Sequence, residues 1–311
     1  MSSAAADARV SVVVLTHNRV DELERSLRHL LRLPERPPIV VADNASHDGS
    51  AERLARGFPQ VACVRCAANR GAAGRNDGVA RVRTPYVAFC DDDTWWAPGA
   101  LSRAADLLDA HPRLAAVAAR VLVGADERLD ATCEAMAASP LEARGLPGPA
   151  LIGFMAGAVV MRTAAYREVG GYEPRLFIGA EEGLLGLDLA ARGWQMAYAA
   201  EVVVHHHPSS LRRSRHRHML LASNRIRIAW LRLSAGAAWQ ESLAALREAR
   251  ARALVVPVLC RVLRGLPWML ARRRVVPRPV EQMYRTVHAA QPARARRSVR
   301  PAPRDADARA P

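Results

Sequence analysis

Residues 86–96, YVAFCDDDTWW, join a short apolar run to three consecutive aspartates. Tyr86–Cys90 is apolar and rich in strand-forming residues, so we expect a buried strand there. Adjacent carboxylates repel one another strongly unless a cation lies among them. Asp91 and Asp93 are two residues apart, so they can face the same way and hold a hard divalent ion through oxygen. A solvated acidic turn is the alternative interpretation of the same residues.

On both sides of this stretch, short apolar runs alternate with segments of helical spacing. Strands are predicted at Val10–Thr16, Ile39–Asp43, Val61–Val64, Ala156–Met161 and Tyr198–His205. Helices are predicted at Val20–Leu33, Ser50–Arg56, Gly74–Val82, Pro98–Leu108, Glu181–Arg192 and Arg212–Leu233. The alternation predicts an α/β domain with a mainly parallel, mixed central sheet flanked by helices. Ligands of such folds bind at the carboxyl ends of the strands, where the polar clusters THNR (16–19) and DNASHDG (43–49) also lie.

Seven segments in this order resemble the family 2 glycosyltransferases. They are VSVVVLTHNR (10–19), VVADNASHDGS (40–50), NRGAAGRNDG (69–78), YVAFCDDDTWW (86–96), GAVVMRTAAYREVGGY (157–172), FIGAEEGLLGLDLAARGW (177–194) and EVVVHHHPS (201–209). The resemblance covers residues 9–232 and implies a GT-A fold, with a nucleotide-sugar half at 9–123 and an acceptor half at 150–232. It also implies the transfer of a sugar from a nucleotide-diphosphate sugar to an acceptor hydroxyl, in the synthesis of cell-envelope polysaccharide or glycolipid.

The resemblance assigns roles to residues of the first half. The expected donor-binding residues are Thr16, Asn18, Arg19, Asp43, Asn69, Gly71, Arg75 and Asp92, with Asp43 receiving the base or ribose. Asp91 and Asp93 are the expected ligands of a divalent metal, Mn²⁺ or Mg²⁺, with Asp93 favoured for direct contact. His205 is a further candidate ligand, although His206, His207 and an exposed strand end remain alternatives. Trp95 or Trp96 either forms a floor for the sugar or packs in the core.

In the second half, the resemblance assigns catalysis to an acidic pair at the start of a predicted helix. Glu182 is the expected general base, which takes the proton of the acceptor hydroxyl, and Glu181 is the alternative. First-turn acids are also common because they interact favourably with the helix dipole. The family mechanism is a single displacement that inverts the anomeric configuration.

Charge divides the chain unevenly. Residues 1–204 hold 22 arginines and 25 acids, whereas residues 205–311 hold 23 arginines and five acids. The chain contains no lysine. Residues 233–290 are therefore predicted to form a basic helical extension, and the Arg/Pro-rich residues 291–311 a disordered tail. Within the extension, residues 251–274 mix apolar residues with arginine, which suits either an interfacial helix on an anionic membrane or a helix packed on the catalytic body.

Other features bear on location and on competing functions. We find neither a signal peptide nor an uninterrupted apolar run of spanning length, so we expect a cytoplasmic protein. A peripheral position on the inner face of the membrane follows only if residues 251–274 form the interfacial helix. A nucleic-acid-binding protein is the rival from another class, but the basic region lacks a recognisable base-reading motif, and no nucleic acid is expected as a partner. A nucleotidyltransferase is the rival enzyme, yet the first strand ends in THNR rather than in a glycine-rich phosphate loop. The expected partners are a nucleotide-sugar donor and a saccharide or lipid-linked acceptor.

Overall fold

A computed structural model describes residues 9–143, 145–208 and 215–297, with side chains up to residue 290. The strands are β1 (Val10–Thr16), β2 (Ile39–Asp43), β3 (Ala62–Arg65), β4 (Tyr86–Asp91), β5 (Thr94–Trp96), β6 (Leu114–Val123), β7 (Arg128–Leu129), β8 (Ala158–Arg162) and β9 (Gln195–His206). The helices of the α/β part are α1 (Val20–Leu30), α2 (Ser50–Gly57), α3 (Gly74–Val79), α4 (Ala100–Ala110), α5 (Ala131–Ala137), α6 (Thr163–Glu168) and α7 (Glu181–Ala191), with a 3₁₀ turn at Gly71–Ala73. The later helices are α8 (Arg215–Arg232), α9 (Ala235–Arg250), α10 (Val255–Arg264), α11 (Leu266–Arg272) and α12 (Arg278–Arg297).

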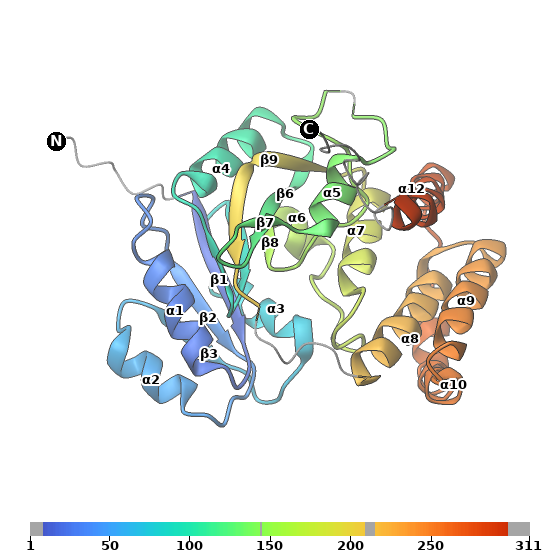
Figure 1. The fold of residues 1–311 in the computed structure, drawn as a ribbon, viewed down its shortest axis with the longest axis horizontal. Coiled ribbons are helices and arrows are strands. Elements are labelled where there is room, and N and C mark those ends of the chain that lie inside the picture. The colour runs from blue at the N-terminus through green and yellow to red at the C-terminus, as the bar shows by residue number, and fades with distance from the viewer. Residues whose placement is uncertain (1–8, 144, 209–214, 298–311) are drawn as a thin grey trace, which may run out of the picture.

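One nine-stranded sheet forms the centre of the molecule, with strand order β3-β2-β1-β4-β8-β6-β9-β5 and β7 paired to β6 (Figure 1). The pairs β3–β2, β2–β1, β1–β4 and β6–β9 are parallel. The pairs β4–β8, β8–β6, β9–β5 and β6–β7 are antiparallel. The predicted mixed α/β sheet is confirmed. It is less parallel than predicted, because four of the pairs formed by strands after β4 are antiparallel and only the β6–β9 pair is parallel.

The apolar runs that predict the strands form the core of this sheet. Val12, Val13 and Val14 of β1 are fully buried, as is Phe89 of β4. A strand that is apolar at consecutive positions must be covered on both faces, and helices lie on both sides of the sheet (Figure 1).

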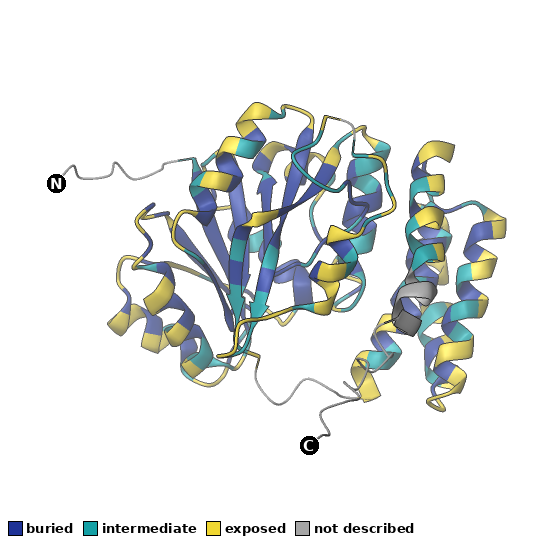
Figure 2. Cartoon of the chain, turned by 45° about the horizontal axis from the view of Figure 1, so that its top comes forward, coloured by how far each residue is buried: buried dark blue, intermediate teal, exposed yellow. Residues whose placement is uncertain are grey.

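The helices that follow the sheet pack on one another. Ala222 and Ile226 of α8 share a small apolar core with Ala245 and Ala249 of α9 and Val258 of α10. Figure 2 shows this bundle beside the sheet, with buried residues on its inner faces and exposed residues outside. The predicted helical extension is confirmed, and α8, which we expected to close the catalytic domain, contributes to the bundle core.

The predicted boundary of the disordered tail at residue 291 falls inside α12, which continues to Arg297. Alanine and arginine are strong helix formers, which favours this continuation. Residues 298–311 of the predicted tail lie outside the described residues. Within the described part of the chain, no helix combines the length and the apolar composition that crossing a bilayer requires.

Candidate active site

The carboxyl ends of β1, β2 and β4 meet at one edge of the sheet. Because these strands are parallel, Thr16 lies level with Asp43, and Leu15 lies level with Asp91. The sequence clusters that follow the strands are therefore brought together, as expected for ligand sites of α/β folds.

A cavity of about 550 Å³ opens at this edge and reaches across to the start of α7. Nine of the predicted site residues line it: Thr16, Arg19, Asn69, Gly71, Arg75, Asp91, Asp92, Glu181 and Glu182. The two predicted halves of the site thus share a single cavity, although Asp91 and Glu182 are 91 positions apart in the chain.

Arg19 neutralises two of the three aspartates. Its guanidinium lies 2.5 Å from Asp92 Oδ1 and 3.1 Å from Asp93 Oδ2. Thr16 Oγ1 donates a hydrogen bond to Asp92 Oδ2 at 3.2 Å. Burial raises the pKa of Asp92 to about 7, with repulsion from Asp93 and Asp91 adding to the shift and Arg19 opposing it.

Arg75 lies between the two acidic clusters. Its helix, α3, packs closely on β1, and glycine at position 78 permits this approach, since a Cβ there would lie only 2.6 Å from Val13 Cγ1. Arg75 is buried, forms an ion pair with Asp91, and lies with its guanidinium carbon 5.5 Å from the centre of the Tyr172 ring. Burial alone would lower the pKa of Arg75, but Asp91 and the neighbouring glutamates raise it, so the side chain stays charged.

The glutamate pair begins α7 on the opposite side of the cavity. Glu181 is buried with 4% exposure, and Glu182 is partly exposed to the cavity. Burial raises the pKa of both carboxyls, and the pKa of Glu181 is raised further by its repulsion from Glu182. A carboxylate whose pKa lies closer to neutrality is a more effective proton acceptor at physiological pH.

The loop before α7 is held in an unusual conformation. Phe177 and Ala180 have positive φ angles of 66° and 67°, which side-chain-bearing residues rarely adopt. Asn224 of α8 is fully buried and donates hydrogen bonds to the carbonyls of Leu176, Ile178 and Gly179, at distances of 2.8 to 3.2 Å. The helical bundle thereby fixes the loop that positions the glutamate pair. Nothing in the sequence pattern distinguishes Asn224 from a solvent-facing residue.

Gly71 connects the loop after β3 with the loop before α7 through backbone contact. Its φ is +59°, and a Cβ at this position would lie 2.1 Å from the carbonyl oxygen of Phe177. The same carbonyl accepts a hydrogen bond from the Ala72 amide at 2.7 Å. Only glycine satisfies both the backbone angle and the close approach.

We expect Gly71→Ala to lower the free energy of unfolding by about 3 kcal/mol, because it combines a backbone clash with a left-handed φ. Gly99→Ala is the matched control, since Gly99 has a φ of +80° with nothing within 4 Å of an added Cβ. The control should lose only about 1 kcal/mol. Chemical denaturation of the two variants measures the difference, and equal losses would contradict the argument from the Phe177 contact.

Four predicted site residues lie outside the set that lines the cavity. Asn18 is in the adjoining loop, where its side-chain oxygen accepts a hydrogen bond from the His47 amide at 2.7 Å. Asp43 is fully buried and accepts a hydrogen bond from the Ser46 amide at 2.9 Å. Asp93 is also fully buried, beneath Arg19.

The fourth of these residues, His205, faces away from the aspartates. Its ring lies 3.2 Å from Glu127 and stacks near Trp95, whereas His206 lies 3.5 Å from Asp93. Neighbouring residues of a strand point to opposite faces, so the structure brings His206 rather than His205 to the acids. Trp95 stacks on His29 and Trp96 is buried, so the packing alternative describes both tryptophans.

Other cavity residues were not predicted. His216, Arg217 and Leu221 at the start of α8 line the cavity, as do Asn44 and Phe177. The predicted helix Arg212–Leu233 gave no reason to place these side chains in the site, because their spacing shows only that they are polar. Their approach to the site depends on how α8 packs against the sheet.

The aspartates can supply part of a divalent metal site. Asp91 offers carboxylate oxygen at the cavity, and Asp93 and His206 lie behind it. No set of three or more metal-binding side chains converges anywhere in residues 9–297 that the structure describes. The donors present fit Mg²⁺ or Mn²⁺, which take one or two protein carboxylates and complete their shell with phosphate and water.

Solved structures place this fold in a known class. A mannosyltransferase of Pyrobaculum calidifontis, solved with GDP-mannose and Mn²⁺, superposes with a TM-score of 0.51 at 21% identity, over 92% of this chain and 87% of the other. GalNAc-T7, solved with UDP, GalNAc and Mn²⁺, gives 0.55 at 15% identity, over 73% of this chain and 48% of the other. The protein therefore has the GT-A glycosyltransferase fold.

Sequence comparison identifies the family. The profile of Glycosyl transferase family 2 matches residues 11–170, which is more than half of the chain, so this protein belongs to that family. It is 26% identical, over 63% of its length and 75% of the relative, to N-acetylglucosaminyl-diphospho-decaprenol L-rhamnosyltransferase of Mycobacterium tuberculosis. It is 34% identical, over 32% of its length and 31% of the relative, to the succinoglycan biosynthesis protein ExoU of Rhizobium meliloti. Family membership confirms glycosyl transfer as the activity, in preference to nucleic-acid binding or nucleotidyl transfer.

Proposed function

We propose that this enzyme transfers a sugar from a nucleotide-diphosphate sugar to an acceptor hydroxyl with inversion, in the assembly of a cell-envelope polysaccharide or glycolipid. The observation that supports this most is the single cavity shared by the aspartates after β4 and the glutamates of α7. A donor diphosphate near Asp91 would leave its sugar facing Glu182. The acceptor can then approach from the side opposite the leaving group.

We assign the donor side to the residues at the ends of β1, β2 and β4. The nucleotide side comprises Thr16, Asn18, Arg19 and Asp43. The Asp43 carboxylate accepts a hydrogen bond from the Ser46 amide and so fixes the turn that follows β2. Asn69, Gly71 and Arg75 form the diphosphate side, where Arg75 supplies permanent positive charge. Asp92 is assigned to the sugar.

We assign Asp91 and Asp93 to a bound Mn²⁺ or Mg²⁺, with His206, whose Nε2 lies 3.5 Å from Asp93 Oδ1, as a further candidate ligand. Such an ion neutralises the charge that develops on the leaving nucleoside diphosphate. The Mn²⁺ in the two solved structures of similar fold supports this assignment. His205, our candidate from the sequence, is less favourably placed because its side chain contacts Glu127.

We assign the proton transfer to Glu182. The acceptor oxygen forms a bond to the anomeric carbon while the bond from that carbon to the diphosphate oxygen breaks, and the hydroxyl proton passes to the Glu182 carboxylate. Burial raises the pKa of Glu182, and repulsion from Asp91 adds to this shift. Glu181, which is adjacent, is the alternative base. No covalent intermediate with the enzyme forms.

The acceptor we propose is a lipid-linked saccharide. The rhamnosyltransferase relative is named for such an acceptor, a sugar diphospho-decaprenol. Exposed Ile178 and Leu221 at the cavity give its rim an apolar character. Such an acceptor would be met at the inner face of the cytoplasmic membrane, where we expect the enzyme to lie peripherally.

A panel of UDP-, dTDP- and GDP-sugars tests the proposal. We expect one nucleotide class to raise the melting temperature in the presence of Mn²⁺ or Mg²⁺, and the same donor to release nucleoside diphosphate when an acceptor is added. If no nucleotide sugar changes the melting temperature with either ion, the proposed donor site is wrong.

A further inference from the structure

The helices α10 and α11 expose a stripe of large apolar side chains. Among the residues whose side chains the structure describes, eleven large apolar ones are exposed, and six of these fall within residues 256–275. The stripe comprises Val256, Leu259, Leu263, Leu266 and Leu270, of which Val256, Leu263 and Leu270 are 64 to 70% exposed. Large apolar side chains exposed in a contiguous group mark a surface that binds something.

Helical spacing places these residues on one face. Val256, Leu259 and Leu263 follow one another at three and four positions in α10, and Leu266 and Leu270 are four positions apart in α11. Gly265, the turn residue between the two helices, stays in the right-handed region (φ −87°, ψ −5°), and the exposed Leu263 and Leu266 lie three positions apart on either side of this turn. The opposite face is already used, because Val258 packs in the bundle core and Met269 is buried in the main core.

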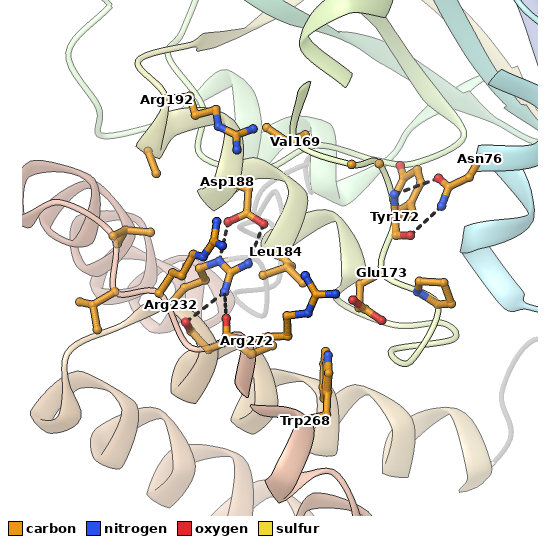
Figure 3. A pocket seen from close by; sticks show the side chains of 18 of the residues that line it. Asn76, Val169, Tyr172, Glu173, Leu184, Asp188, Arg192, Arg232, Trp268 and Arg272 are labelled. Carbon is orange, nitrogen blue, oxygen red and sulfur yellow. Dashed lines mark hydrogen bonds and ion pairs between the residues drawn. The ribbon is translucent and has the colours of Figure 1, made fainter. Parts of the chain in front are cut away.

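The segment of chain that carries the stripe is basic. Residues 249–280 contain eight arginines and no aspartate or glutamate. Arg264 is exposed at the edge of the stripe. Arg272 and Arg274 are exposed at its end, where they line a cavity of about 630 Å³ together with Trp268 (Figure 3). Two acids also line this cavity, Glu173 and Asp188, and Asp188 is already paired with Arg232.

We propose that this stripe and its arginines bind an anionic membrane surface. The leucines enter the boundary between headgroups and acyl chains, and the arginines contact lipid phosphates, the arrangement expected of an interfacial amphipathic helix. Arg272 and Arg274 extend the contact into the cavity of Figure 3, which is large enough for a phosphate headgroup. This inference adds a surface to the proposed function, since a lipid-linked acceptor lies in that membrane, but vesicle binding does not depend on sugar transfer.

A second copy of the chain fits this surface less well. Two identical faces in a symmetric dimer would bring the exposed arginines of both copies together, Arg264, Arg272 and Arg274 among them, with no acid from residues 249–280 to offset them. Anionic lipid supplies the opposite charge along the whole length of the stripe.

Flotation of the full-length protein with vesicles tests the proposal. We expect binding to phosphatidylcholine vesicles that contain phosphatidylglycerol, little binding to phosphatidylcholine alone, and weaker binding at high salt. Leu263→Asp and Leu270→Asp should each reduce binding to the anionic vesicles about tenfold. Arg272→Gln with Arg274→Gln should reduce the preference for the anionic lipid.

Matched controls separate this surface from general effects of substitution. Leu129→Asp on β7 replaces an exposed leucine outside the stripe, and Arg103→Gln on α4 replaces an exposed arginine far from it in the chain. Both should bind vesicles as the wild-type protein does. A protein that fails to float with anionic vesicles at low salt overturns the proposal, as does a wild-type dimer that Leu263→Asp converts to a monomer. If the wild-type protein floats with anionic vesicles but transfers no sugar from any nucleotide-sugar donor, the result would instead count against the proposed function.

Discussion

Glu182→Gln should lower the rate of sugar transfer by about 10²- to 10⁴-fold while donor binding stays close to that of the wild type. Glutamine keeps the size of the side chain and removes the proton acceptor. Glu182 lines the cavity that also contains Asp91, and it is partly exposed there. Release of nucleoside diphosphate measures the transfer, and the melting temperature with and without donor measures binding.

Glu181→Gln is the matched control, because Glu181 is adjacent but buried. We expect a smaller loss of transfer in this variant, caused by the changed environment of Glu182. The pH profile gives an independent check. Since burial raises the pKa of Glu182 and the base must be ionised, the wild-type rate should fall on the acid side at a higher pH than an ordinary glutamate would give. Unchanged turnover in Glu182→Gln, with loss in Glu181→Gln, would transfer the role of base to Glu181.

The sequence predicts the first half of the fold well because its strands are apolar at consecutive positions. Val10–Thr16 and Ile39–Asp43 are strands with the predicted bounds. Residues 114–123, in contrast, suggested no element but form β6, a central strand of the sheet. Their sequence, LAAVAARVLV, is rich in alanine, which favours helices and is depleted in strands, so only the pairing with β8 and β9 makes it a strand.

The same physical distinction applies to the site. Residues that directly follow a parallel strand, such as Thr16 and Asp91, could be placed from the sequence because strand ends define the edge of the sheet. The orientation of His205 could not, because the pairing of β9 with β6 shifts register between Ala119 and Arg120, so that Ala199 pairs with the first and Val203 with the second. This irregularity lies before the histidines in β9. It interrupts the alternation of side chains between the two faces of the strand, so the face on which His205 lies could not be deduced from the sequence. The hydrogen bonds from Asn224 to the loop before α7 depend on the packing of α8 against that loop. No local sequence pattern predicts them.

Asp93→Asn should abolish the metal-dependent part of donor binding. If Asp93 is a metal ligand, the loss of its charge removes one of the few protein donors, and we expect donor affinity in Mn²⁺ to fall by about a hundredfold or more. Asparagine fills the same space beneath Arg19, which keeps its ion pair with Asp92, so the fold should be retained. Titration of the donor with and without Mn²⁺ measures the effect.

Comparison with the neighbouring aspartates determines which carboxylate holds the ion. Asp91 is one-third exposed and pairs with Arg75. The Asp93 carboxylate is fully buried and pairs with Arg19. A cation bound at Asp91 would therefore compete with Arg75, and a cation bound at Asp93 would compete with Arg19. Asp92→Asn should leave the Mn²⁺ dependence in place, because Asp92 is already satisfied by Arg19 and Thr16. If Asp93→Asn binds donor with an unchanged response to Mn²⁺ and Asp91→Asn does not, the ion is held from the cavity side by Asp91. Asp93 would then act by positioning Arg19 and His206, which both lie against its carboxylate.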